Sequence, residues 1–386
     1  MVYLDNAATV PLLPEVKTAM QEAMETYFGN ASALHTPGHL AHNKIEETRE
    51  LLAKLINANP EEIIFTSGST ESNNTVMHIF ENQVISASPY EHDSVLNSAK
   101  TYARKLQKYP VTDDANLVSI MLANNELGEI YELPHGNFYL HSDLTQALGK
   151  IPIDVRKLNL DYATFSAHKI GGPLGVGALY IRKGVPFKPL IIGGNQENKR
   201  RGGTYNTIDI IGFGAALKYV LGHKTWEQYE KKVRPLRDEL AKRILEEIPG
   251  SRANTEILAH SGGYDRGLAS EPRNDGREER GDKIPVLALL PNILNVSFEA
   301  AEGESIQLYL DAEEIIVSTG SACAAGDIKP SHVLMAKTHD AEVAHSSIRF
   351  SFGLNNTKED INKVMTVLPG IIKKLQGMST IGVKHG

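Results

Sequence analysis

Residues 165–177 place Lys169 behind a serine and a histidine and ahead of a glycine-rich turn. Upstream, Asp143 and Gln146 follow a short apolar run. A lysine in a loop of small residues can form a Schiff base, and an acid at a strand end can keep a pyridinium nitrogen protonated. Each motif alone equally fits a surface lysine or a capping aspartate. In this order, the pair predicts pyridoxal 5'-phosphate (PLP) as the cofactor.

Residues 65–74 run from an expected strand through small residues into an expected helix. Backbone N–H groups and the helix dipole bind phosphate at such a point, and the Ser69 and Thr70 hydroxyls add donors. Taken alone, this turn is better explained as an ordinary Ser/Thr N-cap. With Asp143 and Lys169 downstream, a phosphate-bearing cofactor becomes the better explanation.

Two more polar residues follow expected strands. His92 could lay its imidazole on the cofactor ring, and Asn125 could hydrogen-bond to the phenolic oxygen of the cofactor. Both lie at the carboxyl ends of strands, where open α/β sheets bind ligands. A lone loop histidine usually faces solvent, so only the other motifs favour His92.

Cys323 lies among small residues ahead of Pro330. A free cysteine is more often a buried small hydrophobe, and reactivity requires thiolate character. The small neighbours favour an accessible thiol in a flexible segment, which in a PLP enzyme suggests sulfur chemistry. Arg349 alternates with apolar residues on an expected strand and could clamp a substrate carboxylate. A solvated strand arginine is the usual alternative.

The elements that must position these residues alternate along the first two-thirds of the chain. Apolar runs of strand length occur at residues 62–66, 84–87, 117–122, 138–141, 163–166 and 176–181, and helical spacing occurs at 15–27, 42–56 and 70–80. This alternation predicts an α/β fold with βαβ units around a mainly parallel sheet. After a long helical region at 208–248, strands at 293–298 and 347–352 predict a smaller α+β domain.

Composition narrows the class of protein. The 386 residues suit two domains, and 41% hydrophobic with 23% charged residues is ordinary for a globular protein. A formal charge of −7 gives no reason to expect nucleic acid or a membrane as partner. The single cysteine excludes an intrachain disulfide, and the N-terminus lacks a signal-peptide pattern. We therefore expect a cytoplasmic protein.

Residues 261–283 differ from the rest of the chain. They are rich in Gly, Arg, Glu and Asp and nearly free of apolar residues. Such a segment cannot bury enough surface to order itself, which favours a mobile surface insertion over a partner-binding loop.

Together, the motifs resemble those of cysteine desulfurases of the iron–sulfur cluster assembly type, which are fold-type I PLP enzymes of the class-V aminotransferase family. The resemblance covers almost the whole chain and rests on residues 3–9, 29–35, 67–74, 91–92, 124–126, 143–146, 166–169, 201–204, 318–323 and 348–353. It implies a large domain with a mainly parallel seven-stranded sheet (13–210). It also implies a smaller α+β domain (1–12 and 211–386) that carries the cysteine loop.

The resemblance also implies a role for each site residue. Lys169 would hold PLP and shuttle the α-proton, His92 would stack on the ring, and Asp143 would pair with the pyridinium nitrogen. The remaining cofactor contacts would come from Gln146 and Asn125 at the phenolic oxygen and from Ser69, Thr70, Ser166 and His168 at the phosphate. Thr204 would reach the phosphate of the partner subunit, which implies a homodimer. Substrate would be held by Arg349, Asn6 and His35.

The implied activity is removal of sulfur from L-cysteine, giving alanine and a persulfide on Cys323. The sulfur would pass to an iron–sulfur scaffold or another acceptor, such as one for tRNA thiolation. No resident metal is expected, although Cys323 could transiently share a cluster iron with a scaffold partner. The alternatives are a selenocysteine lyase, a kynureninase-like or other PLP lyase that does not need Cys323, and a PLP-binding docking platform. The region 84–141 is shorter than in typical members, whereas 261–283 is an addition.

Overall fold

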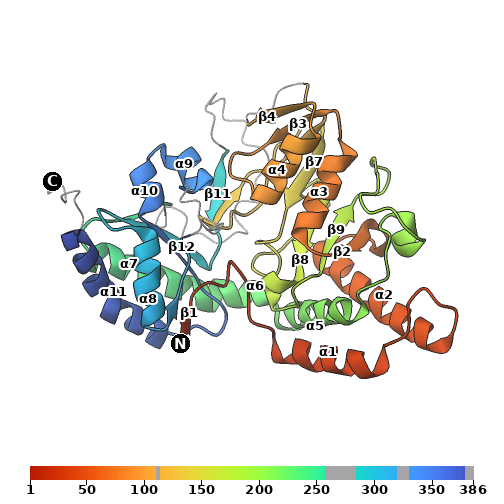
Figure 1. Cartoon of the computed structure of the whole chain (residues 1–386), viewed down its shortest axis with the longest axis horizontal. Coiled ribbons are helices and arrows are strands. Elements are labelled where there is room, and N and C mark those ends of the chain that lie inside the picture. The colour runs from red at the N-terminus through yellow and green to blue at the C-terminus, as the bar shows by residue number, and fades with distance from the viewer. Residues whose placement is uncertain (110–113, 257–283, 320–329, 379–386) are drawn as a thin grey trace.

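A computed structural model describes residues 1–109, 114–256, 284–319 and 330–378. A seven-stranded sheet lies at the centre of the larger unit of the molecule (Figure 1). Its order is β2 (Ile63–Thr66), β9 (Gly177–Ile181), β8 (Tyr162–Ser166), β7 (Tyr139–Asp143), β5 (Leu117–Ser119), β3 (Val84–Ala87) and β4 (Lys105–Lys108). Only β9 runs antiparallel to its neighbours. The predicted α/β fold with a mainly parallel seven-stranded sheet is confirmed.

Alternating strand residues bury both faces of this sheet, as the period of two in a strand requires. Ile64 and Leu179 belong to the cluster under α3 (Ser69–Ile79) and α4 (Asp93–Tyr102). Their chain neighbours Phe65 and Ala178 belong to the cluster on the opposite face. That face is covered by α1 (Pro14–Thr26), α2 (Thr36–Ile56) and α5 (Thr207–His223), and both α1 and α2 pack on α5. The result is a sheet between two helical layers.

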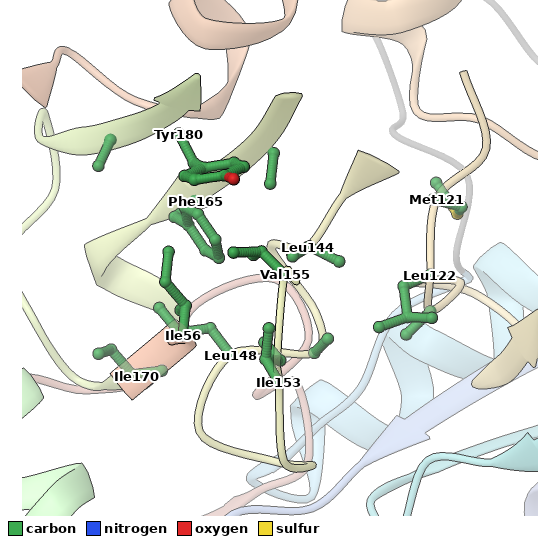
Figure 2. Packing of buried hydrophobic residues seen from close by; sticks show 14 of the residues in the cluster. Ile56, Met121, Leu122, Leu144, Leu148, Ile153, Val155, Phe165, Ile170 and Tyr180 are labelled. Atoms are coloured by element: carbon green, nitrogen blue, oxygen red, sulfur yellow. The ribbon is translucent and has the colours of Figure 1, made fainter. Parts of the chain in front are cut away.

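The core reaches the turn that carries Lys169. Figure 2 shows Phe165, Leu144, Leu148 and Ile170 within one group of buried side chains. Because Ile170 is buried directly after Lys169, the sheet and its packing fix the position of this lysine.

The second unit is a smaller sheet with helices. Its antiparallel order is β10 (Ser251–Ala253), β12 (Ile293–Phe298) and β14 (Ser347–Ser351), beside α7 (Arg234–Glu247), α8 (Gly303–Ala312), α9 (His332–Thr338), α10 (Ala341–His345) and α11 (Lys358–Met378). At the N-terminus, β1 (Val2–Tyr3) pairs with β13 (Ile315–Ile316), and Val2 and Leu4 join the core of this unit. In Figure 1 the N-terminus accordingly lies beside α8.

We keep the two-domain division as a proposal, with residues 1–12 in the second unit. The helical region expected at 208–248 is divided into α5, the short α6 (Thr225–Gln228), the π-helical turn η4 (Tyr229–Val233) and α7. Lys224, at φ 45°, ends α5 in the left-handed region. Because α5 packs on α1 and α2, we propose the boundary after His223 rather than at residue 210.

A strand pair joins the two units. β6 (Glu129–Tyr131) pairs with β11 (Val286–Leu289) in antiparallel register. This pairing brings the segment after Asn125 close to the second unit. Within the described ranges, no helix has both the length and the apolar character needed to cross a bilayer.

Candidate active site

A cavity of about 330 Å³ lies at the carboxyl ends of the central strands, between the two units. Nine of the predicted site residues line it: Ser69, Thr70, His92, Asn125, Asp143, Gln146, His168, Lys169 and Arg349. Its volume falls in the usual range for small-molecule sites. The fold therefore brings together groups that are up to 280 positions apart in sequence (69 to 349).

Lys169 lies in a short 3₁₀ turn, η2 (Ala167–Ile170), directly after β8. Its Nζ donates hydrogen bonds to the carbonyl oxygens of Ala7 and Ala8, both at 2.7 Å. Burial lowers the pKa of Lys169 to about 8, and the nearby Arg349 acts in the same direction. A lysine that loses its proton near neutral pH is suited to attack a carbonyl group.

Asp143 ends β7 and is buried. One carboxylate oxygen accepts a hydrogen bond from Asn73 Nδ2 at 2.8 Å, and the other accepts one from the backbone N–H of Thr145 at 2.9 Å. These donors are neutral, so the Asp143 charge stays available to a cationic group in the cavity.

The other end of the cavity begins at the N-terminus of α3, where Ser69 and Thr70 lie. Gly68 precedes them at φ 151°, a conformation that glycine adopts readily. A Cβ atom on Gly177 would lie 2.7 Å from Gly68 Cα, so the turn packs closely on β9. Free N–H groups at this helix start can receive an anion.

His168 lies beside the reactive lysine, and its Nδ1 is 3.2 Å from Thr9 Oγ1. Burial, together with the charges of Lys169 and Lys150, lowers the pKa of His168 to about 4. The imidazole is therefore neutral at physiological pH and can donate one hydrogen bond and accept another.

Arg349, on β14, reaches the cavity from the second unit. It pairs with Asp5 Oδ1 at 2.8 Å and donates to the backbone oxygen of Asn125 at 2.9 Å. Its buried Nε has no hydrogen-bond partner among the described residues.

His92 lies at the start of α4 and lines the same cavity. It caps the helix by accepting a hydrogen bond from the backbone N–H of Ser94 at 3.1 Å.

Four predicted residues within the described ranges do not line this cavity. Asn6 is buried and donates to the backbone oxygen of Ser351 at 2.9 Å, whereas His35 is exposed and caps α2. Ser166 is buried at the end of β8. Thr204 is exposed and lines a separate cavity of about 200 Å³. Cys323, like the predicted insertion at 261–283, lies outside the described residues.

Three polar residues that contact predicted site residues were not themselves predicted. Asn73 holds Asp143, and Asp5 holds Arg349. Lys150 is fully buried behind Lys169 and donates to its backbone oxygen at 3.4 Å. Burial and the charge of Lys169 lower the pKa of Lys150 to about 7. Asp5 and Asn73 lie within segments already recognised as motifs, but nothing in the sequence identifies their partners.

The donor set fits PLP. The cavity offers a reactive amine, a buried carboxylate for a ring nitrogen and a helix N-terminus for a phosphate. Gln146 donates to the backbone oxygen of Ala7, and its buried amide oxygen has no partner in the described part of the chain. This oxygen lacks a hydrogen bond that a bound ligand would supply.

Comparisons with known proteins agree with this geometry. The sequence profile described as Aminotransferase class-V matches residues 2–261 and 284–364. A cysteine desulfurase IscS of Dictyoglomus turgidum is 39% identical over 98% of this chain and 96% of that protein. Another, from Methanosarcina thermophila, is 38% identical over 100% and 95%. The structure of a NifS-like protein from Rickettsia africae has a TM-score of 0.79 at 30% identity, covering 97% of this chain and 99% of that one. The chain therefore belongs to the aminotransferase class-V family.

Proposed function

We propose that the protein is a PLP-dependent cysteine desulfurase. The observation that carries this proposal is the meeting of Lys169, Asp143 and Arg349 in one cavity. The names of its relatives point to the same activity.

PLP, when bound, supplies an electron sink for the Cα electrons of an amino acid. Lys169 would hold the cofactor and, once displaced by the substrate amine, remove or return the Cα proton through Nζ. Its lowered pKa leaves a much larger neutral fraction than an ordinary lysine has at the same pH. Asp143 would keep the pyridine nitrogen protonated, and Arg349 would bind the substrate carboxylate by its guanidinium. His92 and Gln146 would flank the ring.

Sulfur removal requires a nucleophile besides Lys169, and Cys323 is the candidate. In the net step its thiol takes the sulfur of L-cysteine, forming one S–S bond as the substrate Cβ–S bond breaks. The products are L-alanine and a Cys323 persulfide, so atoms and electrons balance. Two equivalents of an external thiol would then release sulfide and restore Cys323, forming a disulfide.

The test is to incubate purified protein with L-cysteine and dithiothreitol and to measure alanine and sulfide together. Equal amounts of the two products are expected. Pyruvate and ammonia in place of alanine would contradict the proposal.

The matched variant Cys323→Ser separates the alternatives. If the protein is a desulfurase that uses Cys323, the variant should bind PLP but release no sulfide. The reason is that a hydroxyl is a far weaker nucleophile than a partly ionised thiol. Mass analysis of the wild-type protein after brief exposure to cysteine should show one added sulfur on the peptide that contains Cys323. Retained sulfide release in the variant would favour a lyase that does not use this residue.

The active form is proposed to be a homodimer. The support is a set of exposed apolar side chains from the α1–α2 region and nearby loops: Met24, Phe28, Leu34, Leu40, Leu174 and Ile192. Apolar residues exposed together commonly mark an interface between copies. Thr204 lies in a loop close to Ile192, since Gly202 packs on Gly193, and would contact the partner's cofactor. Sedimentation should give a dimer, and a fully active monomer would exclude this assembly.

The sulfur acceptor is proposed to be a scaffold protein or another sulfur-accepting protein. Support comes from the chemistry of the proposed Cys323 persulfide, whose outer sulfur must pass to another thiol or acceptor before the next turnover. Transfer of radiolabelled sulfur from the persulfide form to a candidate acceptor would test each pairing.

A further inference from the structure

A bidentate ion pair between Arg201 and Glu71 links the start of α3 to the loop that carries Thr204. Arg201 Nε and Nη2 donate to the two carboxylate oxygens of Glu71 at 2.9 and 3.1 Å. The Glu71 side chain is only 8% exposed, and that of Arg201 is 25% exposed. The same carboxylate accepts the backbone N–H of Ser67 at 2.8 Å. Glu71 thus fastens the turn before α3 to the 201–204 loop.

The negative charge of Glu71 would disfavour phosphate binding at the start of α3 unless a cation neutralised it. It directly follows Ser69 and Thr70, which line the cavity at the helix start. An unpaired carboxylate here would repel a phosphate group. Burial by itself would raise the pKa of Glu71, but the hydrogen bonds from Arg201 and Ser67 lower it below its ordinary value. The carboxylate therefore stays ionised, and Arg201 neutralises it.

The loop before Arg201 is held in a strained conformation. Glu197, Asn198 and Lys199 have φ values of 47°, 54° and 66°, and such a run persists only where the surroundings enforce it. Arg49 provides the restraint by donating to both carboxylate oxygens of Glu197, at 2.8 and 3.0 Å. The strained backbone at residues 197–199 therefore leads directly into the segment from which Arg201 reaches Glu71.

Neither member of the pair lines the cavity with Lys169. Arg201 instead lines the neighbouring cavity of about 200 Å³, together with Ser67 and Thr204. Any effect on a bound cofactor must therefore pass through the turn 67–70 or the loop 201–204.

We propose that Glu71 and Arg201 are positioning residues for the phosphate group of the cofactor. The pair holds the turn 67–70 in the conformation that binds phosphate, and it links this turn to the loop that carries Thr204. This inference rests on the proposed function, since it requires PLP to bind with its phosphate at α3.

The test compares two ligands that differ only in the phosphate. Apoprotein of the wild type, Glu71→Gln and Arg201→Met is titrated with PLP and with pyridoxal, and affinities are read from the visible absorbance of bound ligand. Arg201→Met should bind PLP at least about tenfold more weakly, the effect of losing one charge-assisted hydrogen bond, because it also leaves an unpaired carboxylate beside the phosphate. Glu71→Gln should bind PLP more weakly too, but by less, because it loosens the turn while removing that carboxylate. Pyridoxal affinity should stay unchanged. The double variant should be no weaker than the worse single variant, because both remove the same interaction.

The matched control is Lys188→Met, which breaks the exposed pair of Lys188 with Glu81, just beyond the other end of α3. This variant should bind both ligands as the wild type does. If Arg201→Met does not fold, the nearly isosteric Glu71→Gln carries the test.

An equal loss of PLP and pyridoxal affinity in Glu71→Gln would overturn the inference, because it would indicate general destabilisation. Unchanged PLP affinity would overturn it as well. Failure of the proposed function looks different: the wild-type protein itself would not prefer PLP to pyridoxal, and both conclusions would fall.

Discussion

The proposed cofactor end of the cavity, around Asp143, and its proposed substrate end, around Arg349, differ in how their charged groups are partnered. At the cofactor end, Asp143 is held by the neutral donors Asn73 and the Thr145 backbone. At the substrate end, Arg349 already pairs with the carboxylate of Asp5 at 2.8 Å. Asp143 can act on a cationic ring without giving up a partner. In its proposed role, Arg349 would have to share or release Asp5 when a substrate carboxylate arrives.

This difference separates two uses of a buried charge. A charge held by fixed neutral dipoles is ready for a permanent ligand and costs no rearrangement when that ligand reacts. A buried charge that pairs with another ionised group is stabilised while no ligand is present, because burying an unpaired ion destabilises the folded protein. Substrate, which comes and goes at each turnover, suits the second arrangement. Substitutions at the two ends should therefore differ in their effects on turnover and on substrate binding.

The largest effect is expected for Asp143→Asn. The variant should retain PLP but lose about 10²- to 10³-fold in kcat, the usual loss when one preorganised electrostatic group is removed. Alanine formation gives kcat, and PLP content is measured after alkaline release. Near-normal turnover would show that the Asp143 charge is not needed.

The next effect concerns pH at the cofactor end. Lys169 must be neutral to attack PLP, and its pKa of about 8 is well below the ordinary 10.5. The rate of PLP attachment to apoprotein should therefore fall about tenfold per pH unit below pH 8 and level off above it. Stopped-flow absorbance between pH 6 and 10 measures this profile. A rate still rising tenfold per unit beyond pH 9 would mean that burial does not lower the lysine pKa.

At the substrate end, Arg349→Lys should lower kcat/KM for L-cysteine by about tenfold or more and leave PLP affinity unchanged. Lysine keeps the positive charge but cannot form the planar bidentate contact of a guanidinium with the substrate carboxylate. Steady-state kinetics and a PLP titration together measure the two quantities. Loss of PLP affinity instead would place Arg349 at the cofactor end.

The smallest effect is expected for Asp5→Asn, which removes the carboxylate partner of Arg349. With its carboxylate partner removed, Arg349 should bind substrate more readily, so KM for L-cysteine should fall by up to about fivefold, the value of a modest ion pair. Steady-state kinetics measures this change. A rise in KM would show that Asp5 orients Arg349 rather than competing with substrate.

Sequence patterns predicted the central strands because these are continuous apolar runs. The strand β4 was missed, since Lys105, Gln107 and Lys108 leave only Leu106 as an apolar signal. The pairing of β6 with β11 joins segments about 155 residues apart, which local pattern cannot indicate. The break at Lys224 likewise depends on a single backbone conformation.

At the site, the chemically distinctive residues could be recognised but not their partners. Lys169 and Asp143 were found because their types and order are unusual. Asp5 and Arg349 are 344 positions apart, and Asn73 and Asp143 are 70 apart, so only the fold brings them together. Lys150 carries no local signal, because a lysine in an expected loop looks like a solvated side chain.

Reductive trapping of the cofactor tests whether Lys169 is the lysine that binds PLP. The holoprotein is treated with borohydride, digested and analysed by peptide mass spectrometry, with Lys169→Ala as the paired variant. We expect one reduced phosphopyridoxyl group, on the peptide that contains Lys169, and none in the variant. A label on another lysine, above all the buried neighbour Lys150, would contradict the assignment of the active site.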